Sequence, residues 1–279
     1  MLADLGTVLA KAQRGRYAVG SFNTANLELT QAILAAAEAA RAPVIVSTTE
    51  KAIAYGDIEV LAAMIRILGA RAKVPVVLNL DHGHHLATVR AAIRAGYTGV
   101  MYDASTRPYR ANARQTKTVV RLCHRARISV EGELGSVGGR ADLGANARYT
   151  DPHEAAAFVR DTGVDALAVM IGNAHGGQFP EERLRFDLLT AIRRVVRVPL
   201  VLHGASETPA AHFRQAIRLG ITKVNIDTTL RKTFTTVLRR TLDAHATVYD
   251  PRAVLGASRA AVQRVVKRHL ALFGSAGKV

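Results

Sequence analysis

The fold of this chain follows from three successive runs of its sequence: VPVVLNL (residues 74–80), LATVRAAIRAG (86–96) and GVMYDA (99–104). The first and last runs are almost continuously apolar, which is typical of strands that are buried on both faces of a parallel sheet. The middle run predicts a helix that ends at Gly96, because glycine is a frequent helix C-cap residue. Together they predict one β-α-β unit with two parallel strands.

Similar apolar runs recur along the chain at the spacing of a β-α unit, with helical stretches between them. Eight such units in 279 residues predict a (β/α)8 TIM barrel in a single domain, residues 1–279. The residues from about Asp250 onward predict an extra C-terminal helical segment. A doubly wound open sheet is the alternative, but its first strand usually precedes a glycine-rich turn, and here SFNTAN (21–26) follows. The predicted strands are YAVGSF (17–22), PVIVST (43–48), VPVVLNL (74–80), GVMYDA (99–104), ISVEGEL (128–134), DALAVMI (165–171), PLVLHG (199–204) and KVNIDT (223–228).

Composition excludes several classes of protein. The hydrophobic fraction of 49% is too high for a disordered chain, and a single cysteine excludes a disulfide scaffold and a cysteine-based zinc site. We find no apolar run long enough for a membrane span and no signal peptide, so we expect a cytoplasmic globular protein. The net charge of +16 indicates a nucleic acid, a membrane surface or an anionic small molecule as partner.

Reactive side chains follow the predicted strands, at the end where a TIM barrel builds its active site. Three of them are histidines, His82, His175 and His203, and Asp81 and Glu133 are among the nearby acids. Three histidines with an optional carboxylate can hold Zn²⁺ and keep one position open for substrate. The turns after the last strands also predict a phosphate site, formed by Gly176, Gly204, Ser206 and Thr228 with the amides near Asp227. We expect His84 and His85 to lie in solvent or to shape the loop.

Five ordered motifs resemble those of the class II, zinc-dependent ketose-bisphosphate aldolases. The resemblance covers nearly the whole chain, from about Tyr17 to the tail DPRAVLGASRAAVQ. It implies a metal-dependent aldol cleavage within a TIM barrel. The motifs are NLDHG (79–83), VEGELGSVGG (130–139), YTDPHEAAAFVRDTGVDALAVMIGNAHG (149–176), PLVLHGAS (199–206) and KVNIDT (223–228).

The resemblance implies a role for each matching residue. His82, His175 and His203 match the zinc ligands, Glu133 matches an acid near the metal, and Asp81 matches the acid/base at the C4 oxygen. Asp103 and Ser105 match a second-ion and polar shell beside the metal. Arg259 matches an arginine that reaches the far phosphate from a neighbouring subunit, which implies a homodimer or homotetramer. Asn23, Thr49 and Asn225 match substrate-binding residues. The family's pocket for phosphate and a monovalent cation (Na⁺ or K⁺) is matched by Gly176, Gly204, Ser206, Asp227 and Thr228.

Two positions depart from the family pattern. Ala141 stands where the family has a loop acid that moves a proton at the enediolate carbon, and the adjacent Asp142 could replace that acid. Asn79 replaces the usual first histidine of the HLDHG motif. A third difference, the run DASTRP (103–108), places Arg107 near the rim, as a solvated charge or a phosphate contact. The alternative to a metal is a Schiff-base lysine, but Lys223 is predicted to start strand eight, at the wrong end of the barrel.

The leading functional hypothesis is a zinc-dependent aldolase that cleaves fructose 1,6-bisphosphate to dihydroxyacetone phosphate and glyceraldehyde 3-phosphate. The resemblance implies that Asp227 favours this substrate over a tagatose bisphosphate, whose aldolases often have a small residue at this position. Because of Ala141, two alternatives remain. The chain cleaves another ketose phosphate, such as a deoxy-ketogluconate phosphate, or it is a catalytically weakened protein that binds sugar phosphates. No specific nucleic acid is expected, since aromatic residues make up only 5% and the basic residues spread over predicted helices. These basic residues are Arg193, Arg194, Arg197, Arg231, Lys232, Arg239, Arg240, Arg264, Lys267 and Arg268.

Overall fold

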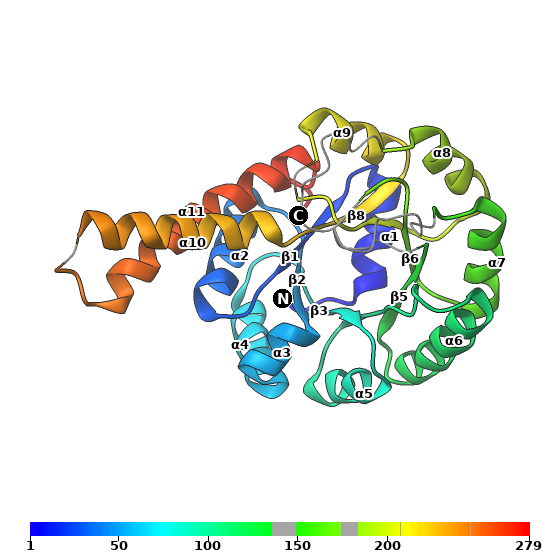
Figure 1. The fold of residues 1–279 in the computed structure, drawn as a ribbon, viewed down its shortest axis with the longest axis horizontal. Coiled ribbons are helices and arrows are strands. Elements are labelled where there is room, and N and C mark those ends of the chain that lie inside the picture. Colours follow the sequence, from blue (N-terminus) through cyan, green and yellow to red (C-terminus); the bar gives the residue numbers. More distant parts are fainter. Residues whose placement is uncertain (136–148, 174–183, 207, 246) are drawn as a thin grey trace.

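Eight parallel strands close into a barrel in the computed structural model, which describes residues 1–135, 149–173, 184–206, 208–245 and 247–279. Each strand pairs with the next, and β1 pairs with β8, so the sheet has no open edge (Figure 1). The predicted TIM barrel is therefore confirmed, and the open doubly wound sheet is wrong. The strands are β1 (Val19–Asn23), β2 (Val44–Thr49), β3 (Val76–Gly83), β4 (Gly99–Tyr102), β5 (Ser129–Leu134), β6 (Ala166–Val169), β7 (Leu200–Leu202) and β8 (Ile221–Ile226).

Helices cover the outside of the barrel (Figure 1). The predicted apolar face of α2 is buried at Leu29, Ala32 and Ile33, and the side chain of Asn26 caps its first turn. Helix α5 ends at Gly96, whose φ of 83° is the left-handed conformation that favours glycine. The helices are α1 (Leu5–Gly15), α2 (Leu27–Ala40), α3 (Glu50–Gly56), α4 (Ile58–Arg71), α5 (Leu86–Ala95), α6 (Tyr109–Arg125), α7 (Pro152–Thr162), α8 (Phe186–Val195), α9 (Ala210–Arg218), α10 (Thr228–Ala244) and α11 (Pro251–Leu272).

The extra C-terminal helical segment is present as α11, which starts one residue after Asp250. Asp250 accepts a hydrogen bond from the backbone N–H of Arg252, and Pro251 occupies the first turn, where it needs no hydrogen-bond partner. Helix α11 packs along α2 and α10. Figure 1 shows α10 and α11 projecting together from one side of the barrel.

Strand β8 starts earlier than the sequence predicts. Ile221 and Thr222 extend it after Gly220, whose φ of 112° turns the chain out of α9. Lys223 is thus the third residue of the strand, and its fully buried side chain donates from Nζ to Glu131 on β5. The prediction that Lys223 starts the strand at the far end of the barrel is wrong. Its Nζ atom is engaged by the carboxylate of Glu131 inside the barrel, which still argues against a Schiff-base role.

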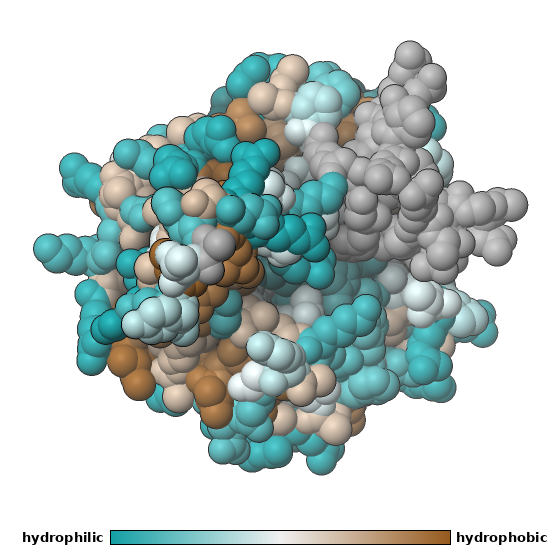
Figure 2. All heavy atoms as spheres, turned by 60° about the vertical axis from the view of Figure 1, so that its left-hand side comes forward, coloured by the Kyte–Doolittle hydropathy of each residue, from teal (hydrophilic) through white to brown (hydrophobic). Residues whose placement is uncertain are grey.

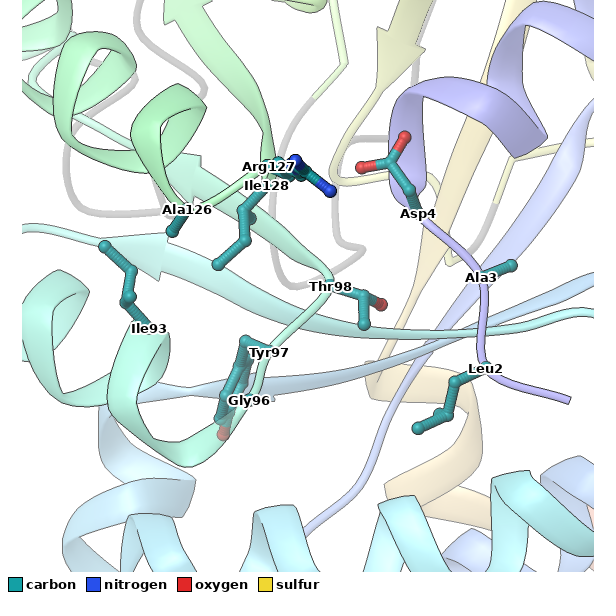
Figure 3. Close-up of a pocket in the computed structure, with 10 residues that line it drawn as sticks. All are labelled: Leu2, Ala3, Asp4, Ile93, Gly96, Tyr97, Thr98, Ala126, Arg127 and Ile128. Carbon is teal, nitrogen blue, oxygen red and sulfur yellow. The ribbon is translucent and has the colours of Figure 1, made fainter.

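A pocket of about 290 Å³ opens at the N-terminal ends of β4 and β5, opposite the strand ends that carry the predicted site residues (Figure 3). Asp4 is the acidic residue of its lining, and its carboxylate accepts hydrogen bonds from Ser129 and from the backbone N–H of Thr7. These bonds fasten the N-terminal segment beneath the barrel. The pocket contains none of the predicted site residues.

Hydrophilic side chains are interspersed with smaller hydrophobic areas on the face drawn in Figure 2. The basic residues that were predicted to lie on outer helices are exposed, apart from the half-buried Arg193. They lie on α8, α10 and α11 and in the connection after α8, rather than at the strand ends. Within the described parts of the chain, we find no helix with the length and apolar character of a membrane span.

Candidate active site

Asp81 lies at the end of β3 and is held from two sides. Asn23 on β1 donates from Nδ2 to its Oδ2 at 2.7 Å, and Asn225 on β8 donates from Nδ2 to its Oδ1 at 2.9 Å. All three side chains are buried. Thr49 is the register partner of Asp81 on β2, and its hydroxyl caps α3. Three predicted residues therefore surround the predicted acid/base from neighbouring strands.

The backbone at His82 is unusual. Its φ is 46°, the left-handed region, and the pairing of β3 with β4 shifts register between Leu80 and Gly83. Such a bulge re-aims a side chain at a strand end. Here it directs Nδ1 of His82 to Oδ2 of Asp103, at 2.8 Å. The other oxygen of Asp103 accepts two hydrogen bonds from Ser105, at 2.7 and 3.0 Å, so this carboxylate has a fixed orientation.

His203 follows β7 and meets His82 across the barrel. Their ring centroids are 4.7 Å apart in an edge-to-face arrangement. The Nε2 atom of the fully buried His203 lies 2.7 Å from Oε1 of Glu131, and its backbone carbonyl accepts a hydrogen bond from Asn173. Both imidazoles therefore have a carboxylate on one nitrogen.

Two groups of ligand atoms lie close enough to hold a metal ion. Atoms of Asp81, His82 and His203 fall within 4.8 Å of one another, and so do atoms of His82, Asp103 and Glu133. Glu133 is almost fully buried, with Oε2 at 3.9 Å from Nδ1 of His82. Imidazole nitrogens together with a carboxylate are a donor set that suits Zn²⁺. The residues present fit a divalent metal ion at this end of the barrel.

The electrostatic balance of the site follows from burial and charge. Burial raises the pKa of Asp81, but the neighbouring His82 and His203 lower it more, to about 2. Burial lowers the pKa of His82, but Asp81, Asp103 and Glu133 together raise it to about 10. Burial also lowers the pKa of His203, which keeps this ring neutral at neutral pH. Without a metal ion, the site thus holds ionised acids around one protonated histidine.

The described residues of the predicted phosphate site lie after β7 and at the start of α10. Gly204 has a φ of 61°, and Ser206 follows two residues later. The hydroxyl of Ser206 accepts a hydrogen bond from the backbone N–H of Asp227 at 3.3 Å, and its carbonyl accepts one from Thr229 at 2.7 Å. Thr228 is the first residue of α10. The amides of a helix N-terminus favour an anion.

Asp227 faces two opposing influences in this pocket. Burial raises its pKa, while its contact with Arg231 at 2.7 Å lowers it. The balance is a raised pKa. Arg231 lies on the exposed side of α10.

Comparison of the chain with known protein families identifies one family. The chain matches the family described as "Fructose-bisphosphate aldolase class-II" over residues 3–278. It belongs to the class II fructose-bisphosphate aldolases. Within that family, the chain is 42% identical to the fructose-bisphosphate aldolase of Geobacillus stearothermophilus, covering 99% of this chain and 98% of the relative.

Two further proteins are also similar to this class II aldolase. A protein of Shouchella clausii (strain KSM-K16) named 6-phospho-5-dehydro-2-deoxy-D-gluconate aldolase is 40% identical, over 98% of this chain and 95% of its own. The crystal structure of the YdjI aldolase from Escherichia coli K12 superposes with a TM-score of 0.90 at 35% identity, over 100% of this chain and 99% of that one. The likeness therefore extends from the sequence to the complete barrel.

Some predicted residues lie apart from this cluster or beyond what the structure describes. His175, Gly176, Ala141 and Asp142 are outside the described residues. Arg259 is exposed on α11 and donates to Gln31 on α2 at 2.7 Å, so its contact lies in the outer layer of helices. His84 and His85 are exposed, and their backbone N–H groups donate to Glu50, which shapes the loop before α5.

Sequence reasoning assigned no role to three residues that the structure brings to the site. Glu131 and Lys223 form a buried ion pair directly behind His203, and Thr229 closes the turn at Ser206. A signal for the first two was present in the sequence. Each is a charged residue in a predicted strand, and a fully buried charge requires an opposite charge nearby.

Proposed function

We propose that this chain cleaves fructose 1,6-bisphosphate reversibly to dihydroxyacetone phosphate and glyceraldehyde 3-phosphate. One observation carries the proposal: the carboxylate of Asp81 lies in a single group of ligand atoms with His82 and His203, each within 4.8 Å of the others. An aldol cleavage needs a base at the C4 hydroxyl and a means of stabilising the enediolate that forms. Such a group supplies the first and can hold an ion for the second.

Zn²⁺ would be held by His82, His175 and His203, with Glu133 as an acid near the ion. When bound, it acts as a Lewis acid that stabilises negative charge on the oxygens of the enediolate. Asp103 lies on the Nδ1 side of His82, and we propose that it fixes this ring rather than only serving a second ion. Ser105 supports it through its two hydrogen bonds.

Asp81 starts the cleavage reaction as the base. Its carboxylate would accept the proton of the C4 hydroxyl and return it in the reverse direction. Asn23 and Asn225 hold both of its oxygens. The same two amides, together with Thr49, would also contact the sugar. Asp142 would exchange the proton at the enediolate carbon.

The phosphate groups bind at the two ends of the site. Gly176, Gly204, Ser206 and Thr228 would bind one phosphate, with a monovalent cation (Na⁺ or K⁺) near Asp227. The N-terminus of α10 favours an anion at this position. In a homodimer or homotetramer, Arg259 would bind the other phosphate of the substrate that lies in the site of a neighbouring subunit. The contact of Arg259 with Gln31 lies on the outer helices of its own barrel, which is consistent with a role outside its own site.

A second candidate substrate has a specific observation in its favour. The relative named 6-phospho-5-dehydro-2-deoxy-D-gluconate aldolase is 40% identical to this chain, nearly as similar as the fructose-bisphosphate aldolase at 42%. Both candidates carry a phosphate and a ketone, which the same pocket can bind. The substrate's carboxylate distinguishes this second candidate from a bisphosphate.

A direct comparison of substrates tests the proposal. The purified protein, with its zinc content measured, is assayed for release of triose phosphate from fructose 1,6-bisphosphate, tagatose 1,6-bisphosphate and 6-phospho-5-dehydro-2-deoxy-D-gluconate. We expect the highest kcat/KM for the fructose substrate. A zinc-loaded protein that cleaves none of the three would contradict the proposal, and a higher kcat/KM for the gluconate derivative would establish the second candidate.

A further inference from the structure

A chain of three side chains runs from the barrel interior to His203. Lys223 on β8 donates from Nζ to Oε2 of Glu131 at 2.6 Å, and Nε2 of His203 lies 2.7 Å from Oε1 of the same carboxylate. All three side chains are fully buried, and they come from three different strands or strand ends, β8, β5 and β7. The two oxygens of Glu131 are thus each directed to a different partner.

We propose that Glu131 and Lys223 are positioning residues for metal binding, which present the Nδ1 atom of His203 to the ion. This inference rests on the proposed function, because it takes His203 as a zinc ligand. Glu131 acts on the metal only through His203. Lys223 in turn acts only through Glu131.

The hydrogen bond between His203 and Glu131 determines which nitrogen of the imidazole carries the proton. An ionised carboxylate can only accept, so the Nε2 atom of His203 must be the donor in its contact with Glu131. A neutral imidazole has one N–H group, and the proton on Nε2 leaves the lone pair on Nδ1 as the ligand atom. Hydrogen bonds of this kind fix both the tautomer and the ring orientation of metal-binding histidines.

Lys223 gives Glu131 the charge balance that this arrangement needs. A carboxylate buried alone is strongly disfavoured, and the ammonium of Lys223 lies on the oxygen that His203 does not use. The ammonium also prevents the carboxylate from turning both oxygens toward the site. The pair therefore holds an acceptor at one fixed point behind His203.

The alternative is an ion pair that only fills the barrel. Two double variants separate these roles, because each removes both charges together and avoids an unpaired buried charge. In E131L/K223M the side chain at position 131 cannot accept a hydrogen bond from the Nε2–H group of His203. In E131Q/K223M the amide oxygen of glutamine can accept it, and the shape is nearly the same. Ser21→Ala, a buried polar change on β1 whose hydroxyl contacts Ser47, is the matched control.

The experiment measures zinc affinity of the metal-free proteins by competition with a chromogenic chelator, after denaturant unfolding has shown that each variant folds. We expect E131L/K223M to bind zinc about 10- to 100-fold more weakly than wild type. E131Q/K223M and Ser21→Ala should stay within a few-fold of wild type. Co²⁺ absorption spectra should change in the leucine variant alone, since they report the geometry around the ion.

Equal zinc affinity in both double variants would overturn the positioning role. A wild-type protein that binds no zinc and has no aldolase activity would instead contradict the proposed function itself. If a double variant does not fold, ¹⁵N NMR of the wild-type histidines gives the answer. A proton on Nε2 of His203 supports the inference, and a proton on Nδ1 in the neutral ring overturns it.

Discussion

The side-chain amide of Asn225 donates to Oδ1 of Asp81 over 2.9 Å and thereby joins β8 to β3 across the closed barrel. Asn23 makes the corresponding bond to Oδ2 from β1. A carboxylate held at both oxygens cannot turn to another partner. We therefore expect Asp81 to present a fixed, ionised group to the substrate, which is the property required of a base that acts at one hydroxyl.

Replacing Asp81 by asparagine removes the base and keeps the shape of the side chain. The expected result is a fall in kcat of about 10²- to 10⁴-fold, because the amide cannot accept a proton. Steady-state assays with fructose 1,6-bisphosphate measure kcat, and zinc analysis checks that the ion is retained. If D81N kept more than half of the wild-type kcat, Asp81 would not be the base.

The stability of the metal-free protein should depend on pH through Asp81. Its folded pKa, about 2, lies below the ordinary value of 3.8, so the group stabilises the fold above pH 3.8 and loses this contribution as the pH falls toward 2. The shift corresponds to about 2 kcal/mol. Urea unfolding of the chelator-treated protein between pH 6 and pH 3 should show a steeper loss for wild type than for D81N. Parallel curves would contradict this expectation.

Zinc binding should release a proton from His82. The surrounding carboxylates outweigh burial and raise its pKa to about 10, so the metal-free protein carries this proton at pH 7, whereas a metal ligand must be deprotonated. Calorimetric titration in buffers of different ionisation enthalpy counts the protons released. We expect about one from this residue, and an apparent affinity that rises about tenfold per pH unit near neutrality. An affinity that is independent of pH would show that His82 is neutral in the metal-free site.

Residues 141 and 142 provide a test of the acid that the family has and that Ala141 replaces in this chain. Asp142→Asn should lower kcat by about 10²-fold if Asp142 moves the proton at the enediolate carbon. Ala141→Glu should then change kcat only a few-fold. The opposite pattern, a large gain in A141E and no loss in D142N, would show that the loop acid is absent from this chain.

Arg259 should affect the KM for the bisphosphate through a neighbouring subunit. Arg259→Gln removes the charge. We expect it to raise KM more than about tenfold, because the phosphate loses a charged hydrogen-bond partner. Gln31→Ala removes the partner of Arg259 on α2 and serves as the control. Mixed oligomers of R259Q and D81N should regain part of the activity that each variant lacks alone. The absence of such complementation would place Arg259 outside a shared site.

The sequence predicts the barrel well because burial on both faces leaves an apolar run for each strand. Strand ends are harder to predict, since Ile221 is part of β8 through its pairing with Leu200 of β7, a residue far away in the sequence. The site residues could be named from their positions after each strand, but their partners could not. Glu131 and Lys223 are far apart in the chain, and the barrel's register alone places one against the other.

Parallel measurement of bound zinc and fructose 1,6-bisphosphate cleavage, in wild type and in His203→Ala, shows whether this chain is a zinc-dependent aldolase. We predict about one zinc ion per chain in the wild type, with triose phosphate formed in proportion to the zinc content. The variant should lose both together. Cleavage that persists in a zinc-free protein, or a fully zinc-loaded wild type that forms no triose phosphate, would contradict the account.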